Sequence, residues 1–270
     1  MRIAWTGAGL AAMALSAAMT AQAADTKEVH RTLSLDRDGR VSIDTFKGTV
    51  TVTTWEKPEV RVDASIEPDG DDRESREKVQ WTEVRISGGG VAVEIKSDYD
   101  EIKHHKHGFL GIFDFENGPL PFVRYTIQMP ATARLEIHDY KSGINVSNLK
   151  GDFKLHTYKG TAKVAGLDGA ARVDTYKGDV QVEFARFSRA SRFDTHKGEI
   201  DVRLPKDSRF DLDADSGRRG DIESDFAVTA RAGRSRAGWS RAVRAAGAVN
   251  GGGPELRLTT YKGTLRVRSS

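Results

Sequence analysis

The sequence predicts an all-β protein: a right-handed, single-stranded β-helix or solenoid-like repeat stack that follows an irregular N-terminal β-region. Three observations predict this fold class. A turn motif recurs with near-constant spacing, apolar residues alternate on both sides of that turn, and helical patterns are nearly absent from the second half of the 270-residue chain.

The recurring motif is Thr–aromatic–Lys–Gly. Seven copies share it, the second with one extra residue before its glycine and the sixth degenerate. They occupy residues 44–48, 139–143, 156–160, 174–178, 194–198, 215–220 and 259–263. In the central block the glycines at 143, 160, 178 and 198 are separated by 17, 18 and 20 residues. A near-constant step indicates one supersecondary unit per copy.

Each unit has the pattern of two β-strands around a corner. Val41 and Ile43 precede the first turn, and Val50 and Val52 follow it, in the alternation typical of half-buried strands. The threonine of the motif has the parity of the inward residues, so we expect it to cap the buried row. The glycine is expected at the corner because it accepts a positive φ.

Two architectures fit this local pattern. In an antiparallel β-meander or sandwich, each Lys-Gly would be a hairpin tip. In a solenoid, each unit would be one coil, and equivalent lysines would lie about 4.8 Å apart, roughly half their spacing in a meander. Near-identity of the turns favours the solenoid, because stacked coils place like residues on like.

The first residues have the features of a secretory signal peptide. Arg2 precedes an apolar stretch from Ala8 to Met19, and Ala21 to Ala23 form a small-residue cleavage site. We therefore predict a signal peptide at 1–23 and a periplasmic or secreted protein after cleavage near Ala23. Residues 24–130 are predicted to form the N-terminal β-region, with two loop excursions, the first containing a candidate helix at about 71–81. Residues 131–270 are predicted to form the repeat region, with a basic insertion at about 228–250.

Composition narrows the function classes. The chain has no cysteine, which excludes disulfides and thiolate metal sites. Its 42 basic and 39 acidic residues give a net charge of only +3, which argues against a nucleic-acid partner. No cofactor is predicted.

Several segments carry a family resemblance. Tyr176-Lys177-Gly178-Asp179-Val180 and His196-Lys197-Gly198-Glu199-Ile200, the glycine-rich stretch at 250–254 and the strand-like segment Val123–Pro130 together resemble the bacterial "putative adhesin" family of exported domains of unknown function. The resemblance covers about residues 40–270. It implies a β-solenoid, and it supplies no catalytic residues, because the family has none established.

The repeated corner is the main candidate binding surface. Its aromatic and lysine residues are the periodic groups free to face a ligand: Tyr158, Lys159, Tyr176, Lys177, His196, Lys197, Tyr261 and Lys262. Our hypothesis is that the lysines attract an acidic glycan or other envelope polymer while the rings supply flat stacking surfaces. The competing interpretation is a self-neutralised ladder, in which the nearby Asp174, Asp194, Asp179 and Glu199 pair with the lysines.

Two further segments are candidate sites. The basic insertion is a candidate for contact with a membrane surface through Arg231, Arg234, Arg236, Trp239, Arg241 and Arg244. The alternative is a solvated, mobile loop. His104, His105 and His107 are weak metal candidates, but a solvated basic loop lacks the surroundings that orient metal ligands, so no metal site is predicted.

A non-catalytic envelope protein, adhesin-like or a scaffold, is the predicted function, and an enzyme is not predicted. The chain lacks Gly-x-Ser-x-Gly and His-Glu-x-x-His motifs. Acids repeated once per coil are typical of ladder elements, whereas a catalytic pair is normally unique. The alternatives are a polysaccharide-active β-helix enzyme and an accessory protein in envelope-stress signalling.

Overall fold

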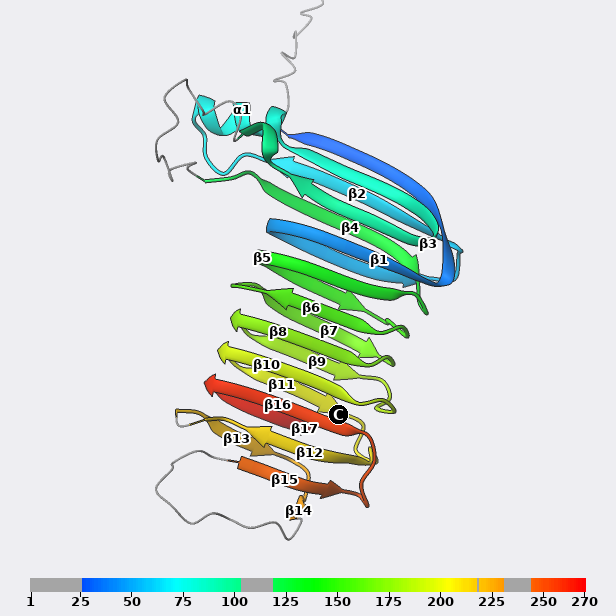
Figure 1. Ribbon diagram of the computed structural model, residues 1–270, viewed down its shortest axis with the longest axis vertical. Helices are drawn as coiled ribbons and strands as arrows, with labels where there is room; N and C mark the ends of the chain where they lie inside the picture. Colours follow the sequence, from blue (N-terminus) through cyan, green and yellow to red (C-terminus); the bar gives the residue numbers. More distant parts are fainter. Residues whose placement is uncertain (1–25, 103–118, 218, 231–243) are drawn as a thin grey trace, which may run out of the picture.

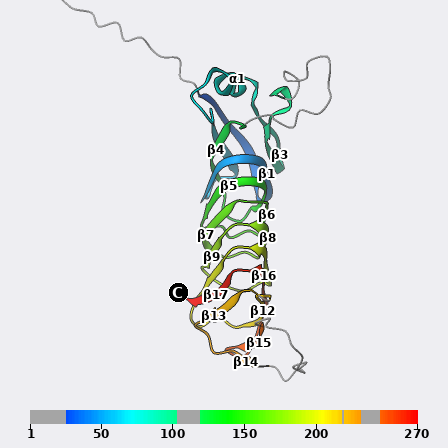
Figure 2. The same cartoon turned by 90° about the vertical axis from the view of Figure 1, so that its left-hand side faces the viewer.

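The computed structural model of the chain describes residues 26–102, 119–217, 219–230 and 244–270. They form one tall stack of flattened coils (Figure 1), and the view turned by 90° shows two facing strand layers (Figure 2). The predicted all-β, solenoid-like fold is confirmed. The predicted signal peptide lies outside the described residues.

The N-terminal part wraps one end of the stack. It contains β1 (Lys27–Trp55), β2 (Glu59–Glu67), α1 (Arg73–Trp81), β3 (Glu83–Asp98) and β4 (Phe122–Pro130). The second half of β1 already pairs in parallel with β5, so the stack begins within this region. The candidate helix is present as α1, and its first turn is capped by Asp72, whose side chain accepts a hydrogen bond from the Ser75 N–H at 2.9 Å.

The remaining strands build the coils. They are β5 (Arg134–Ser147), β6 (Phe153–Thr157), β7 (Thr161–Leu167), β8 (Ala171–Lys177), β9 (Val180–Phe184), β10 (Ser191–Lys197), β11 (Ile200–Leu204), β12 (Phe210–Asp215), β13 (Asp221–Ser224), β14 (Thr229–Ala230), β15 (Arg244–Val249), β16 (Glu255–Lys262) and β17 (Thr264–Ser269). One layer contains β6, β8, β10, β16 and β12; the facing layer contains β7, β9, β11, β17 and β13.

Neighbouring coils pair in parallel and in register. Thr175 lies beside Thr157 on one side and Thr195 on the other, and Lys197 lies between Lys177 and Lys262. A meander would pair successive repeat strands antiparallel, so this alternative is excluded for the repeat coils. The motif threonines are at most 8% exposed, which confirms their inward orientation.

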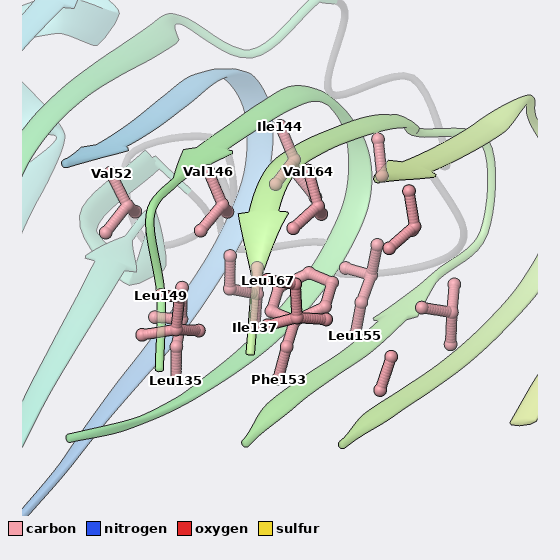
Figure 3. Close-up of a cluster of buried hydrophobic side chains, with 14 of the residues drawn as sticks. Val52, Leu135, Ile137, Ile144, Val146, Leu149, Phe153, Leu155, Val164 and Leu167 are labelled. Atoms are coloured by element: carbon pink, nitrogen blue, oxygen red, sulfur yellow. The ribbon is translucent and has the colours of Figure 1, made fainter. Parts of the chain in front are cut away.

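The core lies between the two layers. Figure 3 shows Leu135 and Phe153 facing Val146 and Val164 across the interior of adjacent coils, and all four are 1% exposed. The alternation seen in the sequence places each such residue inward because successive side chains of a strand point to opposite faces. Burial of this row supplies most of the stabilisation, in the absence of disulfides.

The corner glycines are required mainly by close packing. A Cβ on Gly178 would lie 1.8 Å from the carbonyl oxygen of Gly160, and one on Gly198 would lie 2.1 Å from that of Gly178. Two details of the prediction are wrong. Gly160 does not adopt a positive φ, and Gly143 is not part of the column, because Ser142 occupies the position beside Gly48.

The same shift moves Asp139 inward. It lies beside Thr45 in the threonine row and is 8% exposed, not in the outward aspartate row where the alignment placed it. Its carboxylate accepts hydrogen bonds from Ser142 N–H at 2.9 Å and from the Thr157 hydroxyl at 2.7 Å. The carboxylate thus closes a turn that lacks the motif's own threonine.

The order of coils in space differs from their order in the chain. The C-terminal strands β16 and β17 lie between β10–β11 and β12–β13 (Figure 1). The last coil of the sequence is therefore internal to the stack.

Two buried tyrosines make a prediction about alkaline stability. Burial raises the pKa of Tyr99 to about 12 and also raises that of Tyr125, even though the Ser97 side chain favours the charged form of each ring hydroxyl. The unfolded chain loses these protons near pH ~10, so stability present below that pH is lost as the pH rises towards about 12. For Tyr99 the loss is on the order of 2–3 kcal/mol.

Urea unfolding over this pH range measures the loss. The free energy of unfolding of Tyr99→Phe should fall less steeply with pH than that of the wild type. For Tyr261→Phe, at an exposed position, it should fall as in the wild type. Equal slopes for wild type and Tyr99→Phe would contradict the assignment.

Candidate ligand-binding face

One outward row of the stack is a column of aromatic rings. Successive coils contribute Phe46, Tyr140, Tyr158, Tyr176, His196 and Tyr261. Neighbouring ring centroids are 4.6, 5.1, 4.9, 4.9 and 5.0 Å apart, with interplanar angles of 2–17°. The spacing follows from the distance of about 4.8 Å between paired strands, which brings like side chains into face-to-face contact.

This stacking changes what the rings can offer a ligand. Because each internal ring has a neighbour on both sides, Tyr158, Tyr176 and His196 present edges to solvent and not the flat faces that we expected. Tyr158 and Tyr176 are each 39% exposed, and Tyr261, at the end of the described column, is 50% exposed. The tyrosines can therefore contribute hydroxyl groups and ring edges along a line.

The corner lysines lie beside this column. Lys47 differs from the rest, because it pairs with Asp69 at 2.6 Å and covers the Phe122 ring. Those of the later coils are exposed and make no ion pair with any residue that the structure describes: Lys141, Lys159, Lys177, Lys197 and Lys262. The ammonium group of Lys159 lies 5.3 Å from the centre of the Tyr158 ring, and that of Lys177 lies 5.7 Å from the Tyr176 ring.

The acids expected to neutralise the lysines have other partners. Asp174 pairs with Arg172 at 3.5 Å, Asp194 pairs with Arg192, and Glu199 pairs with Arg266. The Asp179 carboxylate accepts a hydrogen bond from the Glu199 N–H at 2.9 Å. Within the described part of the chain, the self-neutralised ladder is therefore not formed.

A second cationic row was missed in the sequence. It consists of Lys154, Arg172, Arg192 and Arg257, exposed on the same outward layer as the aromatic column. Each stands five residues before a corner lysine, so a full alignment of the repeats, extended upstream of the motif, contains the signal. The outward layer thus bears cations on both sides of the aromatic column.

An open groove runs along the outward layer next to the aromatic column. Asp174, Asp194 and Asp215 line it, with Thr259 and the side of the rings. A catalytic general acid needs a raised carboxyl pKa. Where the pKa of a described carboxyl departs from its ordinary value, the pKa is lowered. At Glu136, for example, hydrogen bonds from Lys154 and His138 stabilise the charged form.

The other candidate residues fall mostly outside the described ranges. These are His104, His105 and His107, and Arg231, Arg234, Arg236, Trp239 and Arg241. Arg244 is described: it begins β15 and pairs with Asp213 at 3.0 Å. The segment predicted as a basic insertion, about 228–250, includes the strands β14 and β15, so the alternative of a solvated loop does not hold for those two parts.

The described ranges lack two features, a cluster of metal ligands and a membrane-spanning helix. They contain no group of three or more histidine or acidic side chains placed to hold a metal ion. No helix among them has the length and apolar character needed to cross a membrane.

The fold and this face define a β-solenoid of two-stranded coils with a surface column of aromatic and lysine side chains. Residues 126–245 match the family described as Toastrack, DUF4097. The resemblance to a "putative adhesin" family of unknown function is thereby confirmed. No curated protein matches the chain.

Solved structures overlap the chain only loosely. A "putative cell adhesion protein" from Clostridium sporogenes is 12% identical, with coverage of 91% of this chain and 100% of that one and a TM-score of 0.44. A "putative adhesin" from Bacteroides fragilis is 13% identical, with coverage of 90% and 97% and a TM-score of 0.39. Overlaps this loose carry no argument about function.

Proposed function

We propose that the protein is a non-catalytic, exported envelope protein, adhesin-like or a scaffold, that binds an acidic envelope polymer along its aromatic–lysine column. The observation that carries the proposal is the row of exposed corner lysines without ion pairs in the described residues, beside stacked rings. Unpaired like charges held in a row repel one another weakly, and a polyanion relieves that repulsion.

The geometry suits a linear ligand. The lysines from Lys141 to Lys262 occupy five successive coils, a span of roughly 19 Å at about 4.8 Å per coil. The polymer would run along the stack axis, with anionic groups on the lysines and hydroxyl groups against the tyrosine edges. The second cationic row adds positive charge on the other side of the aromatic column, although its Arg172 and Arg192 already form ion pairs with aspartates.

Replacing Lys159, Lys177 and Lys197 together by glutamine is expected to weaken binding of a polyuronate. Exposed charge pairs contribute about 0.2–1 kcal/mol each, so the affinity should fall roughly 3- to 150-fold. Titration of the folded protein with polygalacturonate at two salt concentrations measures this, and binding to the wild type should weaken as salt rises. A glycan array then identifies which acidic polymers are bound.

A charge-matched variant controls for net charge. Lys150, Lys163 and Lys206 are exposed, lie off the lysine column, and can be changed to glutamine with the same loss of three charges. This variant should bind polygalacturonate like the wild type, and neutral dextran should bind to neither. If both triple variants bind the polyuronate as tightly as the wild type, the column is not the binding site.

A polysaccharide-active enzyme is the second candidate, favoured only by the acids that line the groove beside the rings. Release of reducing ends from the bound polymer would support it; binding without release supports the adhesin-like or scaffold role. The proposed contact of the basic insertion with a membrane surface is tested separately by liposome co-sedimentation before and after deletion of residues 231–243.

A further inference from the structure

The C-terminal coil occupies a slot made by two other coils. On one layer β16 pairs with β10 and with β12, and on the other β17 pairs with β11 and with β13. Figure 1 shows this last segment of the chain, in red, between strands that precede it in sequence. In the described residues, β12 also pairs with β15 at the end of the stack, and β12 and β13 pair with the preceding coils only through β16 and β17.

Charge is complementary across the border with β12–β13 and mixed across the border with β10–β11, where Arg257 lies beside Arg192, Lys262 beside Lys197 and Arg268 beside Arg203, but Arg266 lies beside Asp201. The segment 254–270 contains four basic residues and one acid, whereas β12 and β13 bear Asp211, Asp213, Asp215, Asp221 and Glu223. Arg266 lies in register between Asp201 and Glu223 and bonds to carboxylates on both sides, Glu199 and Glu223. Arg268 pairs with Asp201 at 3.3 Å. These ion pairs bridge the inserted coil to its two neighbours.

Direct contact between the flanking coils would bring acids together. With β16 and β17 removed and the same register kept, Glu223 would stack on Asp201, and Asp221 would stack on Glu199. On the other layer Asp215 would stack on Asp194, now separated by the neutral Thr259. Two favourable stacks, Arg192 on Asp213 and Arg203 on Asp225, would offset part of this repulsion. Insertion places cations side by side at three other positions, so the charge of the inserted coil fits its neighbours mainly at Arg266, which bonds to Glu199 and Glu223.

The inserted coil is also held by apolar burial and by backbone hydrogen bonds. Leu256, Leu258, Leu265 and Val267 of the inserted coil are each fully buried. Backbone groups close the borders: the Gly198 N–H donates to the Lys262 carbonyl at 3.1 Å, and the Asp221 N–H donates to that of Gly263 at 3.1 Å. The segment is joined to β15 by the exposed turn at Asn250–Gly253, in which three residues have positive φ.

We propose that the slot between β10–β11 and β12–β13 is a recognition site for an extended, basic two-strand segment, filled in cis by residues 254–270 and able to accept the same segment from a second copy of the chain. Strand addition provides the backbone hydrogen bonds, the leucine and valine row provides burial, and the arginines set the choice of segment. This proposal does not rest on polymer binding by the aromatic–lysine column, although Tyr261 and Lys262 of the inserted segment belong to that column.

The test starts from the intact, folded protein. A protease recognition sequence is inserted at Gly251, the chain is cut there after folding, and a fluorescent synthetic peptide of residues 254–270 is added. The peptide should bind the cut protein. It should not bind the uncut protein, because there the slot is filled by the native segment, which is still attached to the rest of the chain. If the native segment stays bound after cutting, it is removed in urea and the peptide is supplied during refolding.

Two variant peptides test whether binding depends on the charge at the slot or only on restoring the missing strands. Arg266→Glu should bind roughly tenfold or more weakly, because it places an acid between two carboxylates, whereas Lys262→Glu, at an exposed position without an ion pair in the described residues, should stay within about threefold of the wild-type peptide. The double variant of the protein, Glu199→Lys with Glu223→Lys, should restore binding of the Arg266→Glu peptide. Equal binding of the two variant peptides, equal binding to cut and uncut protein, or failure of the wild-type peptide to bind the emptied slot would overturn the proposal.

Discussion

Replacing Gly178 by alanine is expected to destabilise the protein by roughly 3–5 kcal/mol, from the combined cost of backbone strain and overpacking. Gly178 has a φ of 155°, a backbone conformation that is strained for any residue with a Cβ. A Cβ added at Gly178 would also lie 1.8 Å from the Gly160 carbonyl oxygen. Neither atom can move freely, because the backbone of each coil is paired with coils above and below it.

Gly143 provides the matched control. It lies next to the corner of another coil, its φ is not positive, and the nearest atom to an added Cβ is the Thr49 methyl group at 3.9 Å. Gly143→Ala should change the free energy of unfolding by less than about 1 kcal/mol, and it can stabilise slightly by restricting the unfolded chain. Urea unfolding followed by circular dichroism measures both variants, and similar losses for the two would show that close coil packing is not the cause.

Phe193→Ala is expected to cost about 3–5 kcal/mol, the range for removing a large buried ring. Phe193 is 0% exposed and packs edge-on against Phe184, with ring centroids 6.5 Å apart. The cavity would lie between two coils whose backbones are held at the strand spacing, so the walls cannot collapse to fill it. A lower unfolding midpoint with an unchanged slope against urea is the expected result.

The same change at the surface isolates the effect of burial. Phe46 is 36% exposed and stacks on Tyr140 with centroids 4.6 Å apart. Phe46→Ala should cost less, about 1–3 kcal/mol, because it loses two aromatic contacts, with Tyr140 and Tyr99, but less buried area than the Phe193 change. A loss at Phe193 no greater than that at Phe46 would contradict the central place of the buried row.

The sequence predicted which residues form the candidate site, but it did not predict which of them form ion pairs. Periodicity placed Tyr176 and Lys177 on the corner, since like residues recur at a near-constant step. It could not assign partners: Asp174 pairs with Arg172 on its own strand, and Asp194 pairs with Arg192. An arginine two residues away on one face of a strand reaches the acid directly, whereas the corner lysine points away from it.

The sequence by itself determined the repeating unit: two strands per coil, apolar residues and threonine inward, and aromatic and lysine residues at the corner. These features depend on period-two alternation and on steric limits at glycine, which act between near neighbours. Only the tertiary structure decided that the ring faces cover one another, that Ser142 replaces Gly143 in the corner column, and that the last coil lies inside the stack. Those outcomes depend on which coil lies beside which, and coils of nearly equal local pattern are distinguished only by contacts such as those of Arg266 with Glu199 and Glu223.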